Sequence, residues 1–417
     1  MYEALLAQID RAIEEAKSSL TQDLAGLIEL KSIYEDTPRP GAPFGDGPLR
    51  VLDAMKKMGE KEGFYTQDYH VGVVSLALKN GSPDLGIWCH GAGNSQGPLC
   101  AIFHLLKIFK ERGVPLNYNP ALYVGSDQQN GMRDMVGISG SADVRGFCNV
   151  CTPPRLSLVP DGVFPVGYGG KGAMVIKFRG NKPLRDLTIA AGQAGSRGTA
   201  EAILHGETIR CCSPVRHPSN PEPYGNMIAQ LMEALLSRQE TALENRLMLE
   251  FFKLVSKDIY GKRLCVDAEN GEMGPLTICA KEINTVAGYP DLTVQIHYPL
   301  GITYGEIARM MTDAAEKYDV AVVDAHNIAK PYVLNKEQKI IRRLTALANE
   351  VTWEEKEPYI LSKDTYANLI PNALVYGMDR ETERSVDEAI SIERLLKGMK
   401  VYARALLTLN DMDWNRM

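Results

Sequence analysis

The chain has 417 residues, of which 45% are hydrophobic and 24% are charged, and its formal net charge at pH 7 is −6. This length exceeds what one ordinary hydrophobic core holds, and it predicts a soluble globular protein of two domains, one of which can be inserted in the other. The acidic balance argues against nucleic-acid binding, which needs clustered Lys and Arg, and no apolar run reaches the ~18 residues that a membrane span needs.

The N-terminal segment and the cysteines bear on the compartment of the protein. Apolar residues occur at helical spacing with acidic residues between them over residues 1–20, which predicts an amphipathic helix and not a signal peptide. The chain has eight cysteines, and its CxxC motif, Cys148 to Cys151, lacks the second cysteine or histidine pair of a zinc cage. We therefore expect a cytoplasmic protein with reduced, structural thiols.

The segment up to residue 131 alternates strands with helices. Helices are predicted at residues 49–63 and 97–110, and strands at residues 71–81, 85–91 and 121–124. Such alternation is typical of βαβ units around a mostly parallel sheet. The last strand leads into residues 126–130, which carry one carboxylate and three amides. Polar side chains at a strand end are a common place for an active site in an α/β sheet.

The pattern changes at about Tyr168 and returns after residue 336. Residues 172–180 alternate as an exposed strand does, and the elements expected after them are helices at 223–238, 240–255 and 305–318 and strands at 292–299 and 320–326. An α+β insert with an antiparallel sheet accounts for this region. The first pattern then resumes with a helix through residue 351 and a closing helix at 391–409, so the first domain is split around the insert.

Several short motifs, in a fixed order, carry a resemblance to a known family. They are APFGDG before a helix, GSDQQ, VPDGVFPV, His217-Pro-Ser-Asn-Pro221-Glu222 followed by Gly225-Asn226, and then MGPLT, QIHYP, DTYANLIPNALVYG and SVDEAISIERLLKGMKVYARALL. In these motifs the chain resembles the di-zinc metallopeptidases and aminoacylases of the M20 type, from its first helix to its last. It resembles most closely the dipeptidase V group of that family.

The resemblance implies an α/β fold, with a zinc-peptidase-like (phosphorylase/hydrolase-like) catalytic-type domain and an inserted α+β lid domain. The first domain is expected to consist of residues 1–167 plus 329–417, and the lid of residues 168–328. A lid of this size resembles the enlarged lid of the dipeptidase V group, which covers the site within one chain. The resemblance therefore favours a monomer over a homodimer.

The family binds two zinc ions that share a bridging Asp, and a Glu takes the proton from the metal-bound water. In this chain Asn94 stands in the bridging place, Gln128 in the place of the general base and Gln129 in the place of a ligand Glu. The late ligand His is replaced by Arg384. An amide supplies no charge to a pair of dications and cannot act as a base, so the resemblance implies a degenerate metal site.

Two ligand positions of the family keep a residue type that binds metal. Asp161 stands in the place of a metal-ligating Asp, although an Asp before a Gly also suits an Asx turn. His90 is either the first ligand His or the equivalent of the aromatic residue just before the following turn. Cys89 and His90 are neighbours in a strand and point to opposite faces, which argues against a thiol and imidazole acting as a nucleophilic pair.

Three further residues match positions at which the family contacts its substrate. His217 matches the lid histidine that steadies the oxyanion, with a plain surface role as the alternative, and Asn226 is kept in the same motif. His297 replaces the Arg that holds a substrate carboxylate, which removes the permanent charge and the bidentate geometry. We expect Arg384 to substitute in part for a metal cation by pairing with Asp161 or with a carboxylate of the ligand.

Two functions are compatible with this sequence. In the first, the protein is a non-catalytic relative that binds a peptide, an acylated amino acid or a partner protein in the cleft between its domains, with no cofactor. In the second, it is an active amide-bond hydrolase, either with one zinc or other divalent metal at His90 and Asp161 or with no metal. The concerted replacement of charged ligands and of the base favours the first.

Overall fold

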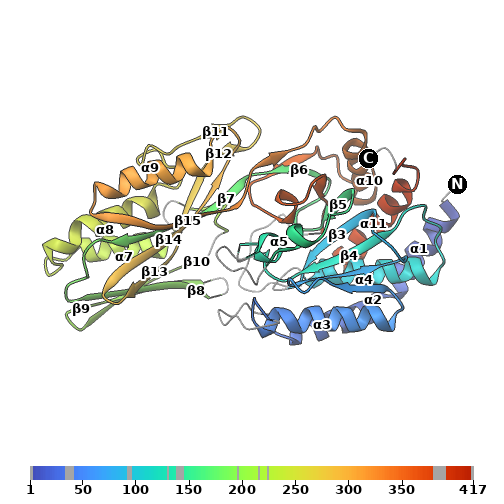
Figure 1. The fold of residues 1–417 in the computed structure, drawn as a ribbon, viewed down its shortest axis with the longest axis horizontal. Helices are drawn as coiled ribbons and strands as arrows, with labels where there is room; N and C mark the ends of the chain where they lie inside the picture. The colour runs from blue at the N-terminus through green and yellow to red at the C-terminus, as the bar shows by residue number, and fades with distance from the viewer. Residues whose placement is uncertain are drawn as a thin grey trace.

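The structure is a computed structural model that describes residues 3–32, 42–91, 96–128, 131–137, 145–194, 197–214, 217–222, 225–378 and 391–414. Two lobes lie side by side along the long axis of the molecule (Figure 1). We call the lobe that contains the first and last helices the body, and the other lobe the insert. Each lobe is built on its own sheet, with its own buried cluster of apolar side chains.

The body has a nine-stranded sheet in the described part of the chain, in the order β1-β2-β4-β3-β5-β18-β6-β16 with β17 paired to β6. Its strands are β1 (Tyr65–Asp68), β2 (Val73–Ala77), β3 (Leu85–His90), β4 (Pro120–Gly125), β5 (Leu156–Val159), β6 (Gly167–Gly170), β16 (Tyr332–Val333), β17 (Tyr359–Leu361) and β18 (Ala373–Val375). The neighbours β4, β3, β5 and β18 are parallel. Towards the edges, β1, β2 and β16 pair antiparallel. The prediction of a mostly parallel sheet is correct for the centre and wrong for the edges.

Helices pack on the body sheet where the apolar periodicity predicts them, except that the N-terminal helix ends early and a second, unpredicted helix follows it. They are α1 (Glu3–Glu15), α2 (Lys17–Glu29), α3 (Asp46–Lys61), α4 (Gln96–Glu111), α10 (Lys339–Thr352) and α11 (Ile392–Leu409), with the short α5 (Arg133–Val136), α6 (Phe147–Val150) and η3 (Tyr366–Asn368) in loops. None of the helices in the described ranges is long and apolar enough to cross a membrane.

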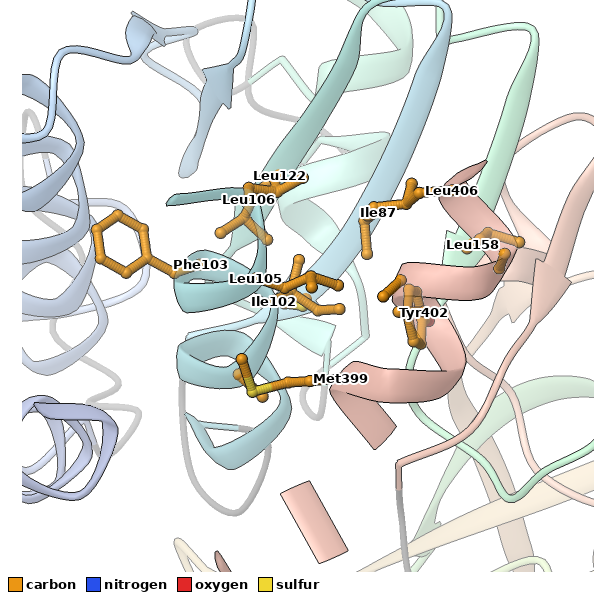
Figure 2. Close-up of a cluster of buried hydrophobic side chains, with 14 of the residues drawn as sticks. Ile87, Ile102, Phe103, Leu105, Leu106, Leu122, Leu158, Met399, Tyr402 and Leu406 are labelled. Carbon is orange, nitrogen blue, oxygen red and sulfur yellow. The ribbon is translucent and has the colours of Figure 1, made fainter. Parts of the chain in front are cut away.

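Helix α4 lies at the centre of the body core. Pro98 suits its first turn, because an N–H there has no partner within the helix, and apolar residues follow it around nearly the whole circumference. Figure 2 shows Ile102 and Leu105 of α4 between the strands and α11, close to Met399 and Tyr402. All four side chains are fully buried. The packing of these two helices on the parallel strands therefore fixes the shape of the body.

The insert has a seven-stranded sheet, in the order β10-β9-β8-β13-β14-β7-β15, with antiparallel pairing throughout. Its elements are β7 (Gly172–Gly180), β8 (Leu187–Ala194), β9 (Arg197–Leu204), β10 (Glu207–Pro214), α7 (Met227–Ser237), α8 (Leu243–Lys257), β11 (Glu269–Asn270), β12 (Gly274–Pro275), β13 (Thr277–Val286), β14 (Tyr289–Tyr298), α9 (Tyr304–Glu316) and β15 (Val320–Ala329). The predicted antiparallel sheet is confirmed. The prediction of an exposed strand at residues 172–180 is wrong, because β7 lies between β14 and β15 and is largely buried.

Two short crossings join the lobes, between β6 and β7 and between β15 and β16. The side-chain amide of Asn368 donates to the carbonyls of Lys171 and Lys330, at 2.9 and 3.0 Å, and so ties the crossings together. The buried ammonium of Lys171 donates to the carbonyl of Pro275, at 2.6 Å. A Cβ atom at Gly172 would come within 2.6 Å of Pro331 and Tyr298, so this crossing needs a glycine. These contacts hold the insert against the body at the edge where the parallel strands end.

We predict that Leu105→Ala lowers the free energy of unfolding by about 2–5 kcal/mol, because it leaves a cavity between α4 and α11. Chemical denaturation followed by circular dichroism measures the change. Ile28→Ala, at a position in α2 that is 50% exposed, is the control and should change the free energy by less than about 1 kcal/mol. Equal losses in the two variants would contradict the assignment of α4 to the core.

Candidate functional site

Four neighbouring parallel strands of the body, β4, β3, β5 and β18, end at one edge of the sheet. His90 is the last residue of β3, Gln128 follows β4, and Asp161 follows β5. Because the carboxyl ends of adjacent parallel strands lie together, the sheet gathers these predicted residues at one place. Three other predicted residues, Asn94, Gln129 and Arg384, lie outside the described residues.

Asp161 is the centre of the contacts at this edge. Its Oδ1 accepts a hydrogen bond from the ammonium of Lys363, at 3.0 Å, and its Oδ2 accepts one from the side-chain amide of Gln128. The side chains of Asp161 and Lys363 are 17% and 25% exposed, so the ion pair is largely removed from solvent. An ammonium and an amide of the chain itself therefore contact both oxygens of this carboxylate.

Two buried carboxylates, Asp127 and Asp134, stabilise the loop that carries Gln128. Asp127 is fully buried and receives two hydrogen bonds from the guanidinium of Arg133, at 2.7 and 2.8 Å. Asp134 accepts from the backbone N–H groups of Ser126 and Asp127 and from the hydroxyl of Tyr366. Burial, and then the charge of Asp127, raise the pKa of Asp134 to about 7. The carboxylate that the sequence places at the strand tip, Asp127, thus has a structural partner.

His90 is 3% exposed and has no hydrogen-bond partner for either ring nitrogen among the described residues. Burial lowers the pKa of His90 to about 4, an effect that the backbone of Gly125 partly opposes. The imidazole is therefore neutral at physiological pH. A neutral imidazole whose nitrogens make no hydrogen bond with a described group suits a metal ligand and also a core residue.

The insert contributes two histidines next to the body. His297 on β14 is fully buried, and its Nε2 lies 2.9 Å from Oδ1 of Asp364. The ring of His217 is 5.8 Å from that of His297, and Nδ1 of His217 lies 2.8 Å from the hydroxyl of Ser219. Burial acts to raise the pKa of Asp364, but the hydrogen bond with His297 and the charges of both histidines lower it below its usual value. His217 and His297, which are distant in the sequence, thus lie together near Asp364.

Asn226 has a clear structural role in the described residues. It is the N-cap of α7, where its Oδ1 accepts from the backbone N–H groups of Ile228 and Ala229, at 2.9 and 3.3 Å. Its Nδ2 donates to the carbonyl of Ala280, at 2.9 Å. Both ends of the amide are engaged in holding α7 on β13. Its contact with a ligand stays a prediction.

Three consecutive residues, Ser362 to Asp364, connect these parts of the site. Ser362 lies 3.4 Å from Ser219, Lys363 pairs with Asp161, and Asp364 pairs with His297. The sequence analysis did not select Lys363 or Asp364. The available signal was the DTYANLIPN motif itself, which begins at Asp364 and directly follows Lys363, so that opposite charges stand side by side at its start.

The described residues form only part of the predicted metal site, because Asn94, Gln129 and Arg384 lie outside them. The described residues contain no group of three or more His, Cys, Asp and Glu side chains placed to hold a metal ion. A zinc site in a protein needs at least three protein ligands, and Asp161 is already contacted on both oxygens by Lys363 and Gln128.

Comparisons with known proteins agree with this architecture, although no family model matches the sequence. The chain is 22% identical over 467 residues to YtjP of Bacillus subtilis, a protein named as a dipeptidase, and the match covers 94% of this chain and 97% of that protein. In structure it is similar to the dipeptidase Dug1p of Saccharomyces cerevisiae, with a TM-score of 0.60, 12% identity and coverage of 98% and 99%. Human carnosine dipeptidase 1 gives a TM-score of 0.58 with the same identity and coverage. The shared fold therefore includes both lobes.

The burial of His90 predicts a specific dependence of stability on pH. As the pH falls below 6.5, the imidazole of the unfolded chain takes up a proton, whereas that of the folded chain does so only near pH 4. Stability should therefore fall over this window, by about 3 kcal/mol in total from His90. His90→Gln should lose this contribution in denaturation curves recorded from pH 7 to pH 4. The raised pKa of Asp134 makes stability rise as the pH falls, but this effect is the same in the wild type and in His90→Gln. An unchanged pH dependence in His90→Gln would contradict the assignment of the loss to His90.

The cap formed by Asn226 predicts how substitutions there behave. Asn226→Ala should destabilise the protein by about 1 kcal/mol, since two N–H groups of α7 lose their acceptor. Asn226→Asp keeps the acceptor oxygen and should destabilise the protein less than Asn226→Ala. Both variants lose the hydrogen bond that Asn226 donates to the carbonyl of Ala280. Thermal unfolding of the two variants tests this order. The reverse order would show that the cap is not the main role of the side chain.

Proposed function

We propose that this M20-type peptidase homologue, which is related in sequence to dipeptidases, binds a peptide or an acylated amino acid between its body and its insert and does not hydrolyse it by a di-zinc mechanism. The observation that carries the proposal is the set of contacts that Asp161 makes. Among the described residues, Asp161 is the carboxylate that stands at a predicted metal position, and it is paired with Lys363 and hydrogen-bonded by Gln128. In this proposal the site is degenerate and the protein is a pseudoenzyme.

The physical reason lies in charge and in proton transfer. Two dications in close contact need several anionic oxygens, and in this reading Asn94 and Gln129 replace two of them by neutral amides while Arg384 replaces a ligand His. Gln128 in the place of the base cannot accept a proton, and general-base assistance worth roughly 10²–10⁴-fold is lost. The binding of the metal ions and the transfer of a proton from water are thereby both weakened.

The ligand class follows from the relatives and from the histidines of the insert. YtjP, Dug1p and carnosine dipeptidase 1 are named as dipeptidases. The rings of His217 and His297 lie beside the body, 5.8 Å apart. His297 is paired with Asp364, so a carboxylate of the ligand competes with that of Asp364. We propose that the insert acts as a lid in a monomeric, cytoplasmic protein, with residues 168–328 forming the lid.

The second candidate is an amide-bond hydrolase with a single metal. The observation that favours it is His90, whose two buried ring nitrogens have no partner among the described residues. With Asp161 and one amide oxygen, His90 would complete the three protein ligands of a catalytic metal site. Lys363 would have to leave Asp161 for this site to form.

Metal content and turnover separate the two candidates. For protein purified without chelators, we expect elemental analysis to find no near-stoichiometric metal and dipeptides to remain intact after addition of zinc, manganese or cobalt. A dipeptide or acylated amino acid should raise the melting temperature by mass action. Bound metal at near-stoichiometric level, with turnover abolished by Asp161→Ala, would instead establish the hydrolase.

A single reverting substitution provides an internal control. Gln129→Glu restores one carboxylate but leaves Asn94, Gln128 and Arg384 in place, so we expect no hydrolysis by this variant. If Gln129→Glu alone hydrolysed dipeptides, the assignment of the substituted ligand positions would be wrong.

A further inference from the structure

We infer that Lys363 is the resident cation of this site: its ammonium supplies to Asp161 the positive charge that a divalent metal ion would otherwise supply, and it excludes such an ion. The inference rests on the proposed function, because it explains how the site is stable without metal. Lys363 is a described partner of Asp161, whereas Arg384 lies outside the described residues, so the expected pairing of Arg384 with Asp161 stays a prediction.

The first step concerns the cost of an unpaired carboxylate. Asp161 lies at the carboxyl end of β5, in the row of parallel strand ends, and its side chain is only 17% exposed. A charge in such a position is stable only with a partner of opposite charge or with strong hydrogen bonds. Gln128 offers a neutral donor, and Lys363 offers the charge.

The second step concerns the position of Lys363. The segment before it is fixed because the backbone N–H of Lys171 donates to the carbonyl of Leu361, at 3.1 Å. The segment after it is fixed by Asn368, whose amide binds the carbonyls of Lys171 and Lys330 at the crossings between the lobes. Lys363 is therefore presented to Asp161 by a braced segment, so that forming the pair costs rotamer freedom of the lysine side chain but little backbone entropy.

The third step concerns competition. A divalent ion that approaches Asp161 meets an ammonium on Oδ1 and the N–H of an amide on Oδ2. Repulsion between unit charges a few ångströms apart is strong in a partly buried setting. The ion can bind only if Lys363 is displaced and Gln128 is turned to present its oxygen. Removal of the ammonium should thus create an affinity for a hard cation that oxygen ligands prefer, such as Mn²⁺.

The test compares Mn²⁺ binding to the intact wild-type chain and to Lys363→Met, measured as loss of the free Mn²⁺ signal in electron paramagnetic resonance. We expect the variant to bind Mn²⁺ at least about tenfold more tightly than the wild type, a change of roughly 1.4 kcal/mol. Saturating Mn²⁺ should raise the melting temperature of the variant and leave that of the wild type unchanged. The double variant Lys363→Met/Asp161→Asn should lose both effects.

Lys182→Met is the matched control, because Lys182 also pairs with an aspartate, Asp319, at 2.7 Å but on an exposed surface of the insert. This variant should bind Mn²⁺ as weakly as the wild type. Lys363→Gln, which keeps a neutral donor to Asp161, gives the same test if the Met variant does not fold.

Equal Mn²⁺ affinity in the wild type and in the folded Lys363 variant would overturn the inference. A gain in Mn²⁺ affinity that persisted in the double variant Lys363→Met/Asp161→Asn would also overturn it. Failure of the proposed function has a different signature, since the wild type itself would then bind metal at near-stoichiometric level and hydrolyse dipeptides.

Discussion

The parallel course of β4, β3, β5 and β18 is the constraint on which the rest of the structure depends. Their carboxyl ends form one edge, so that loops far apart in sequence deliver His90, Gln128 and Asp161 to the same region. The strands keep this alignment because α4 and α11 pack against them with fully buried side chains (Figure 2). The insert leaves and rejoins the body beside this edge, and its histidines are thereby added to the site.

At this edge the protein balances its charges with its own side chains. Asp127 is matched by Arg133, Asp161 by Lys363 and Asp364 by His297. The last two pairs involve adjacent residues of one segment, which contacts the body through Lys363 and the insert through Asp364. A site in which lysine and arginine side chains pair with the carboxylates has a different electrostatic character from one that recruits dications. The fold is similar to that of peptidases, and these carboxylates are paired with side chains of the chain itself.

The sequence predicted best those elements whose pattern is long and strongly apolar. Residues 97–110 and 391–409 correspond to α4 and α11, and residues 121–124 to β4. The hairpin strands β8 and β9 were missed because Ala and Gly dilute their strand character. The order of motifs selected His90, Gln128 and Asp161 together, and the structure shows them at neighbouring strand ends, although the strand before Asp161 was not predicted. That order could not reveal the partner of Asp161, since Lys363 is 202 positions away and the pair exists only through the fold.

The most direct test of this account is a crystal structure of the protein grown with zinc, with anomalous diffraction recorded at the zinc absorption edge. We expect Lys363 Nζ within hydrogen-bond distance of Asp161, and no anomalous peak at that carboxylate. A pair of strong peaks beside Asp161, with the side chain of Lys363 turned away, would contradict the account.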